Sequence, residues 1–475
     1  MAAAAGLRIS QKDNYSANFG DVLRSSGIFY LARTDRLRTT ISLMNYWHFK
    51  RAIEVAVVAT VRSMQGQLIS RQRLEFKRGH VANFSPDVPD GFEGSVEIEA
   101  FSTTNLAIPY AAIMAIYEAP QSISMVHSYS RTYSQHEIDE GRTITVGHEG
   151  CWRIADDDRL ASFCVFHNGP TAQPAQTATL EVICDGETRV AEIKLDALAP
   201  FETRVVRPRD HIPGLVAWLG GREGYVSLDF NLGNAFTRML LGHRRIDDSE
   251  LSVTHSNFDY RRHSTDLADG CEEAFMQLPP QLLKSSRIIV YPHSHKGAYE
   301  MMDGARQRFD SGSALVSAPS STLVRFRALD GTFPSRLVTG LELAAEGRLR
   351  AECSLGVYHA QRPPKRSHWG VVAATDDLAT QIIAVPFASI YGRPSGKVKA
   401  ALYSAATLDV LEAEWSWDAS NEAGHAIGLT DLFPSARLHL GGEFGYVYLT
   451  SEYGGLLCFT QITKANGSTT IEHTF

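Results

Sequence analysis

Residues 219–228 read Leu-Gly-Gly-Arg-Glu-Gly-Tyr-Val-Ser-Leu, and residues 440–449 read Leu-Gly-Gly-Glu-Phe-Gly-Tyr-Val-Tyr-Leu. Each copy is followed by a glycine-containing break, a second apolar run and a β-rich segment that ends at a histidine, His255 or His473. The copies are offset by 440 − 219 = 221 residues at the first motif and by 473 − 255 = 218 residues at the histidine. Two motifs in nearly constant register indicate an internal repeat.

Weaker copies of the same pattern occur twice more. Residues 93–98 precede a segment that ends at His127, and residues 346–351 precede a shorter segment that ends at His359. An apolar run that enters a polar loop also recurs, at residues 41–47, 163–169, 288–297 and 382–387. The sequence therefore predicts about four related units of about 100 to 130 residues, which is the size of an ordinary domain.

The contents of the unit are typical of β-strands. Residues 179–184 and 190–195 alternate between apolar and polar side chains, and Asp185-Gly186 between them is a preferred hairpin dipeptide. Strands separated by such turns favour antiparallel sandwiches over a parallel α/β sheet. We therefore expect an all-β fold of tandem β-sandwich units with little helix. Residues 106–118 are ambiguous between a buried helix and a buried strand.

Two glycine pairs, Gly220-Gly221 and Gly441-Gly442, directly precede predicted strands. We expect them to form a bulge or a turn with positive φ, a conformation that glycine adopts without steric cost.

The repeat and the composition of the connecting segments divide the chain as follows: a flexible N-terminal tail at 1–27, unit 1 at 28–135, a polar connector at 136–158, unit 2 at 159–262, a connector at 263–286, a shorter unit 3 at 287–362, a connector at 363–379 and unit 4 at 380–475.

Composition excludes several classes of protein. The 475 residues are 44% hydrophobic and 21% charged, and the net charge of -7 argues against a surface for nucleic acid. No run approaches the roughly 18 apolar residues that span a bilayer. Residues 1–10 lack the pattern of a secretory signal, so we expect a cytoplasmic protein without a membrane partner. Six irregularly spaced cysteines are too few for a disulfide scaffold, and Cys164, Cys184 and Cys458 lie in apolar strand-like runs, where we expect reduced core residues.

Polar side chains that could carry function are concentrated just after the final strand of units 1 and 2, where loops on a rigid sandwich commonly bind ligands. A separate pair of tryptophans alternates on one predicted strand, either as a face that stacks on a sugar or as part of the core. The candidate ligand-binding residues are His127, Arg131, Tyr133, His255, Asn257, Asp259, Trp415 and Trp417.

A metal site is a second interpretation of the histidine-rich loops. Imidazole and carboxylate groups bind divalent transition metals, and the candidate metal ligands are His136, Glu137, His148, His293 and His295. Their spacing matches no defined metal signature. Alternatively, these side chains hydrogen-bond loop backbones and seal the seams between sandwiches, or contact a polar ligand without a metal.

No complete catalytic signature is present in the sequence: neither a Gly-x-Ser-x-Gly elbow nor a phosphate-binding loop occurs. We therefore predict a non-catalytic β-sandwich repeat protein that binds a small polar molecule such as a sugar or glycan, or that assembles with partners, for example as a homo-oligomer. One alternative is a metal-dependent enzyme, for example one that acts on a glycan, which uses the loop at 127–149 with His255 or His293. The other alternative is a purely structural or oligomeric scaffold.

Overall fold

The computed structural model confirms an all-β fold with eight antiparallel four-stranded sheets. It describes residues 23–76, 80–106, 113–128, 151–229, 239–256, 273–291, 298–310, 315–330, 339–343, 347–355, 366–392, 396–416 and 424–474.

In the described part of the chain, each unit contributes eight strands. Those of unit 1 are β1 (Arg24–Arg33), β2 (Arg38–Met44), β3 (Ala56–Ser63), β4 (Leu68–Leu74), β5 (Val81–Phe84), β6 (Phe92–Phe101), β7 (Ile113–Ala119) and β8 (Ser122–Ser128). Those of unit 2 are β9 (Cys151–Ile154), β10 (Leu160–His167), β11 (Gln176–Cys184), β12 (Glu187–Leu195), β13 (Thr203–Val206), β14 (Gly224–Asp229), β15 (Leu240–Arg245) and β16 (Leu251–His255).

The second half of the chain repeats this arrangement. Unit 3 holds β17 (Glu273–Gln277), β18 (Ser286–Val290), β19 (Ala298–Asp303), β20 (Ala305–Asp310), β21 (Leu315–Ser317), β22 (Leu323–Ala328), β23 (Thr339–Leu343) and β24 (Ala351–Leu355). Unit 4 holds β25 (Ser367–Val372), β26 (Leu378–Pro386), β27 (Lys397–Ser404), β28 (Leu411–Ser416), β29 (His425–Gly428), β30 (Gly445–Ser451), β31 (Leu456–Lys464) and β32 (Thr469–His473).

All four units share one topology. The two sheets of unit 1 have the strand orders β1-β6-β3-β4 and β5-β2-β7-β8. The orders in units 2, 3 and 4 follow when 8, 16 or 24 is added to each strand number. The four apolar runs that recur in the sequence all begin within the second strand of their unit, and residues 219–228 and 440–449 lead into or form the sixth strand of theirs.

One assignment in the repeat was wrong. The sequence matches residues 346–351 to the sixth-strand motif, but residues 347–350 lie between β23 and β24, residue 351 begins β24, and β22 is the sixth strand of unit 3. A Glu-Gly pair does not identify the sixth strand, because it lies inside β6 in unit 1 and ahead of the eighth strand in unit 3. The ambiguous segment at 106–118 ends in β7, so its described part is a strand, and β9, β17 and β25 begin within segments expected to be connectors.

The short helices lie in connections between strands: α2 (Tyr46–Arg51), α4 (Pro208–His211), α5 (Leu215–Leu219), the 3-10 helix η1 (Pro280–Leu282), α6 (Ala388–Tyr391), α7 (Leu429–Leu432) and α8 (Ala436–Leu440). The repeated glycine pairs end α5 and α8, with φ of 56° and 82° at Gly220 and Gly221 and of 59° and 85° at Gly441 and Gly442. Positive φ was therefore expected at these positions, but the helices before them were not. Within the described part, no helix combines the length and the apolar character needed to cross a bilayer.

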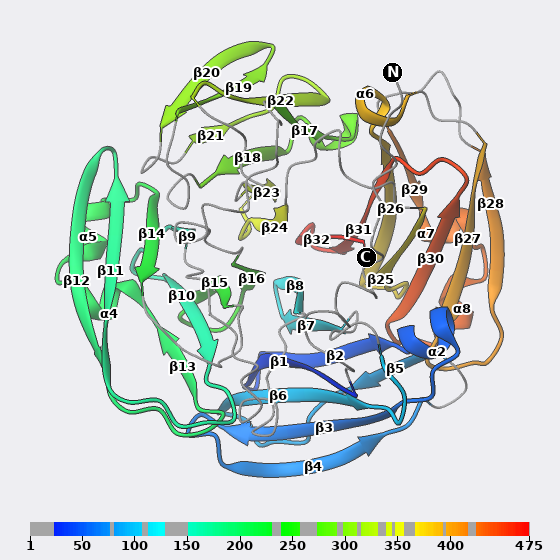
Figure 1. The fold of residues 1–475 in the computed structure, drawn as a ribbon, viewed down its shortest axis with the longest axis horizontal. Helices are drawn as coiled ribbons and strands as arrows, with labels where there is room; N and C mark the ends of the chain where they lie inside the picture. The colour runs from blue at the N-terminus through cyan, green and yellow to red at the C-terminus, as the bar shows by residue number, and fades with distance from the viewer. Residues whose placement is uncertain are drawn as a thin grey trace, which may run out of the picture.

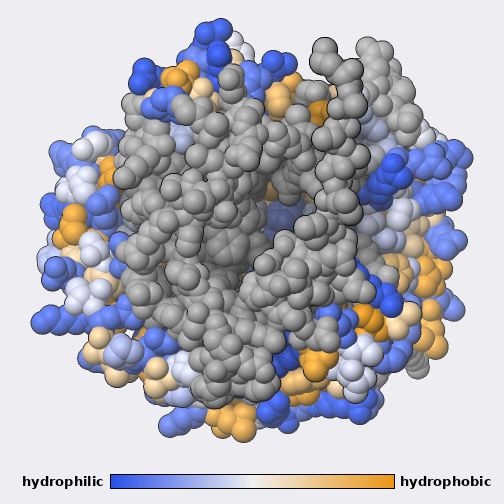
Figure 2. Space-filling view, viewed as in Figure 1, coloured by the Kyte–Doolittle hydropathy of each residue, from blue (hydrophilic) through white to orange (hydrophobic). Residues whose placement is uncertain are grey.

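The units form a ring whose centre is lined by the last strand of each unit (Figure 1). Strand β8 contacts β16, β16 contacts β24, β24 contacts β32, and β32 contacts β8. Seen from the face in Figure 2, the described residues on the rim are largely hydrophilic, with hydrophobic residues in small groups. The exposed large hydrophobic residues belong to different units, for example Leu68, Val190, Leu329 and Leu438.

Three of the four seams between units are apolar within the described residues. The core of unit 1 includes Phe163 and Leu251 from unit 2 and Trp369 and Tyr446 from unit 4. The core of unit 3 includes Leu457 and other residues of unit 4. The side chains of Cys164, Cys184, Cys353 and Cys458 are buried and form no disulfide with one another, in agreement with the core role expected for Cys164, Cys184 and Cys458.

Candidate functional site on the ring axis

The edges of four sheets meet on the axis, because β8, β16, β24 and β32 are each the last strand of their sheet. An edge strand presents unpaired backbone N–H and C=O groups, which are costly when buried. Hydroxyl side chains of the neighbouring strand bind some of these groups. Ser122 Oγ accepts from Leu251 N at 2.8 Å, and Ser124 Oγ accepts from Val253 N at 2.9 Å.

The same kind of contact continues around the axis. Met125 N donates to Thr470 Oγ1 at 3.0 Å, so β32 supports β8 in the way that β8 supports β16. Ser252 Oγ donates to Arg350 O at 2.7 Å, which joins β16 to the segment before β24. Directional hydrogen bonds of this kind fix the four strand ends relative to one another, and their side chains become a preorganised group.

Three histidines at these strand ends converge. His127, His255 and His473 each offer one ligand nitrogen, and these atoms all lie within 4.8 Å of one another. The ring of His127 lies 4.3 Å from that of His255 and 4.9 Å from that of His473, measured between centroids. His127 and His255 are buried, whereas the side chain of His473 is 25% exposed. The cluster is therefore enclosed on two sides and reaches solvent at His473.

Backbone carbonyls orient two of the rings. His255 Nδ1 lies 2.7 Å from Ser256 O, and His473 Nδ1 lies 3.5 Å from Thr474 O. A carbonyl only accepts, so Nδ1 carries the proton in each contact and a neutral ring then has its lone pair on Nε2. This is the arrangement in which proteins hold imidazoles for metal binding, with one nitrogen bonded to the protein and the other directed at the ion.

A buried carboxylate connects the third histidine to unit 3. Glu472 Oε2 lies 3.3 Å from His127 Nδ1, and Glu472 Oε1 accepts from the Cys353 thiol at 3.4 Å. Burial, together with the charge of Glu472, raises the pKa of Cys353 well above its ordinary value, so this thiol is protonated and donates. All four inner strands therefore contribute to the axis: three units supply histidines, and Cys353 ties unit 3 to Glu472.

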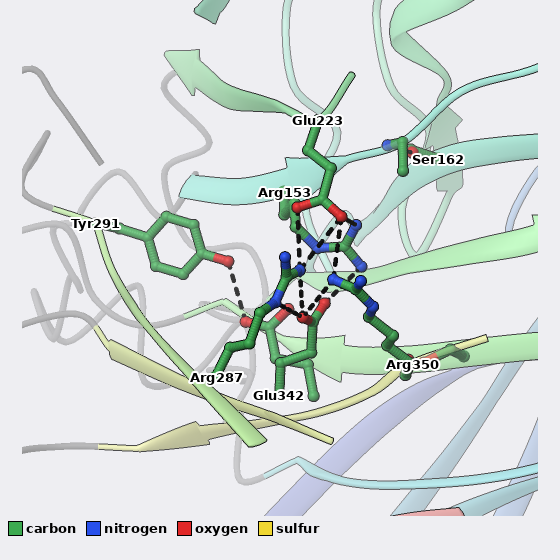
Figure 3. Close-up of polar contacts among 10 residues, drawn as sticks. Arg153, Ser162, Glu223, Arg287, Tyr291, Glu342 and Arg350 are labelled. Atoms are coloured by element: carbon green, nitrogen blue, oxygen red, sulfur yellow. Dashed lines mark hydrogen bonds and ion pairs between the residues drawn. The ribbon is translucent and has the colours of Figure 1, made fainter. Parts of the chain in front are cut away.

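A second polar cluster joins units 2 and 3. Figure 3 shows the guanidinium groups of Arg153, Arg287 and Arg350 around the carboxylates of Glu223 and Glu342. Arg153 of unit 2 forms an ion pair with Glu342 of unit 3 at 2.7 Å. Glu223 of unit 2 forms ion pairs with Arg287 at 3.0 Å and Arg350 at 3.1 Å, both of unit 3. Although partial burial opposes ionisation, the three guanidinium groups hold the pKa of Glu223 below its ordinary value. We call these residues, with Glu352 and Tyr291, the charged seam.

The loop residues proposed from the sequence lie outside the described residues: Arg131, Tyr133, His136, Glu137, His148, Asn257, Asp259, His293, His295, His359 and Trp417. Trp415 is described and is 4% exposed in the core of unit 4, where its Nε1–H donates to His425 Nδ1 at 2.9 Å. This placement agrees with the core interpretation of Trp415 and offers no open indole face to a sugar.

Sequence reasoning placed His127 and His255 in the candidate site but left His473 out of it. The repeat contains the missing signal, since His473 ends the fourth unit as His127 ends the first. Glu472 precedes it directly and has no equivalent in the other units, so no pattern marked it. The members of the charged seam are spread from Arg153 to Glu352, and only folding brings them together.

A polar groove lies between units 1 and 4. It has a volume of about 640 Å³, and its charged and amide lining residues are Arg33, Arg38, Asn83, Glu118 and Glu443. Asn83 spans the seam, because its amide donates to Glu443 at 3.1 Å and to Phe444 O at 2.9 Å. Partial burial raises the pKa of Glu118, and Lys464 and Arg38 counteract the increase.

Comparisons with known proteins give no family. No family model matches the chain, and no curated protein matches it. Among solved structures, a glycosyl hydrolase family 2 member from Bacteroides cellulosilyticus aligns at 6% identity over 95% of this chain and 92% of that chain, with a TM-score of 0.12. At this TM-score the likeness carries no conclusion about the fold or function of this chain.

Proposed function

We propose that this protein binds a divalent transition metal ion on the ring axis through His127, His255 and His473. The observation that carries the proposal is the convergence of three ligand nitrogens, from three different units, within 4.8 Å of one another. Imidazole is a preferred ligand of zinc, copper, nickel and iron. Three protein ligands also leave a coordination position for water or substrate, as in catalytic zinc sites. A metal-dependent enzyme is therefore the more specific form of this proposal.

The ion would also link three units of the ring. An ion that binds only the closed arrangement stabilises it by mass action, and the stabilisation grows with the concentration of free metal. Glu472 would orient His127 and support its ligand nitrogen, as carboxylates do beside metal-bound histidines.

The test is metal content and Zn²⁺ affinity of the full chain, purified without chelator and titrated by calorimetry. We expect about one equivalent of metal per chain. His255→Gln and His473→Gln are expected to weaken Zn²⁺ binding by more than the roughly 10- to 100-fold typical of losing a group that only orients a ligand. His48→Gln is the matched control, because the exposed side chain of His48 on α2 is paired with Glu54 at 2.9 Å and is not part of the cluster. Equal Zn²⁺ affinity in all four proteins would contradict the proposal.

A second candidate function is binding of a small polar molecule in the groove between units 1 and 4. Its support is a volume of about 640 Å³, within the range of small-molecule sites, together with donors and acceptors from two units. A panel of mono- and disaccharides, titrated against the wild type and Arg38→Ala, tests it. Saturable binding that Arg38→Ala weakens supports a site in this groove, and absence of binding to every sugar removes glycans as the ligand.

A further inference from the structure

The charged seam differs from the other three joints of the ring in what it buries. Residues of units 1 and 2, 3 and 4, and 4 and 1 share continuous apolar clusters. Between units 2 and 3, the separate apolar cluster is limited to Ile289 and Tyr291, with Tyr225 and Val316 packed against them. Among the described residues, this contact also contains hydrogen bonds such as that from Ser252 Oγ to Arg350 O, and the ion pairs of the charged seam. The strength of the ion pairs depends on the protonation of their members.

Two carboxylates of unit 3 lie directly opposite each other in this seam. Glu342 on β23 pairs in register with Glu352 on β24, and like charges in that relation repel. A Cβ at Gly340 would collide with the Glu352 carboxylate, so this glycine leaves the space that the side chain needs. Tyr291 donates to Glu352 Oε1 at 3.1 Å. The Glu352 carboxyl is thus held in place beside a carboxylate that is almost fully buried and already bound by three arginines.

We propose that the charged seam is a proton-controlled joint: Glu352 carries a proton when units 2 and 3 are closed together, and losing that proton loosens this seam while the three apolar seams stay closed. The inference is independent of metal binding, because Glu352 contacts none of the three histidines in the described structure.

The groups that face Glu352 come from every element packed around it. Glu342 on β23, Arg287 on β18, Tyr291 after β18 and Arg153 on β9 act on its charge, and His243 on β15 and Arg350 before β24 line the same cavity of about 10 Å³, roughly the space of one water. Loss of surrounding water, followed by repulsion from Glu342, raises the pKa of Glu352 to about 7, against the attraction of Arg153. Burial lowers the pKa of His243 far below its ordinary value and raises that of Tyr291, so both stay neutral near pH 7.

The direction of the effect follows from this difference. In an opened seam Glu352 would be hydrated and would ionise in the ordinary carboxyl range, so the closed seam binds the proton more tightly than the open one. The preference for the closed seam over the open one that comes from Glu352 is therefore fully present below about pH 4.5. It is lost as pH rises to about 7. Each unit of difference in pKa corresponds to about a tenfold change in the ratio of closed to open forms.

Hydrogen–deuterium exchange of the full chain at pH 5 and pH 8, corrected for intrinsic exchange rates, tests the joint. In the wild type we expect the opening equilibrium of β9, β18 and β24 to rise by at least about tenfold at pH 8, while β26 and β31 in the apolar seam change much less. Glu352→Gln keeps the side chain neutral and should keep the seam closed at both pH values.

Two further variants make the test specific. Glu250→Gln is the matched control, because Glu250 lies at the same seam but is paired with Arg245 at 3.0 Å and receives Leu349 N at 3.3 Å. It should retain the wild-type response to pH. Tyr291→Phe removes a donor to the Glu352 carboxylate and should move the opening to higher pH. A wild-type response that persists in Glu352→Gln, or one of equal size in β31, overturns the proposal.

Discussion

The seam between units 3 and 4 and the seam between units 2 and 3 join units of identical topology by opposite means. The first places Leu457 of unit 4 in the core of unit 3. The second places Arg153 of unit 2 against Glu342 of unit 3. Apolar contact is stabilising and depends little on the direction in which side chains meet. A buried ion pair contributes less net stability but allows few alternative arrangements. One fold thus supplies a ring with three firm joints and one that depends on charge.

Removal of one carboxylate from the charged seam should have the largest effect on stability of the changes considered for the two kinds of seam. Glu342 is 1% exposed and contacts Arg153, Arg287 and Arg350. Glu342→Ala removes the more deeply buried of the two carboxylates that these guanidinium groups share, and it is expected to lower the apparent free energy of unfolding by about 3–5 kcal/mol. Urea unfolding measures it, with Glu414→Ala, which breaks the exposed pair with Lys397, as the control. A loss below about 1 kcal/mol, as at an exposed pair, would show that the charged seam is not a joint.

Truncation of a side chain in an apolar seam measures how much that kind of joint contributes to the free energy of unfolding. Leu457 is 4% exposed, and Leu457→Ala is expected to cost about 2–5 kcal/mol through lost burial and the cavity that remains. Because no charge is removed, the loss should be the same in low and high salt. A loss that shrinks strongly with salt would contradict an apolar joint.

The hydroxyl contacts around the axis should contribute less. Ser124→Ala removes the acceptor for Val253 N and leaves that buried N–H without it, at an expected cost of about 1–3 kcal/mol. Thr104→Ala, on an exposed side chain, is a control for the loss of a hydroxyl at the surface. Equal stability of Ser124→Ala and the wild type would mean that these contacts do not fix the strand ends.

The smallest expected effect is the change in the free energy of unfolding with pH, which should distinguish the charged seam from the apolar ones. As pH rises from about 4.5 to 7, the wild type should lose stability, because Glu352 ionises at lower pH in the unfolded chain than in the ring. Glu352→Gln should flatten this part of the curve, whereas Leu457→Ala should shift the curve without changing its slope. Parallel curves for the wild type and Glu352→Gln would remove Glu352 as the group responsible.

The sequence predicted the all-β tandem architecture because its signals are local: glycine pairs, hairpin dipeptides and alternating runs. It also predicted strand-end histidines, since repetition placed them at one position of the unit. It could not predict their convergence, because nothing local says that the last strands of four units meet on one axis. The charged seam was beyond reach for the same reason, as Arg153 and Glu342 are far apart in the chain and Glu223 precedes β14 with no motif to mark it.

X-ray absorption spectroscopy of the Zn²⁺-loaded full chain shows whether histidines of three units bind one ion on the ring axis. We expect three imidazole nitrogens at about 2.0–2.1 Å from zinc, with fewer in His255→Gln and an unchanged spectrum in His48→Gln. A zinc shell with sulfur ligands, or one without imidazole, would contradict it.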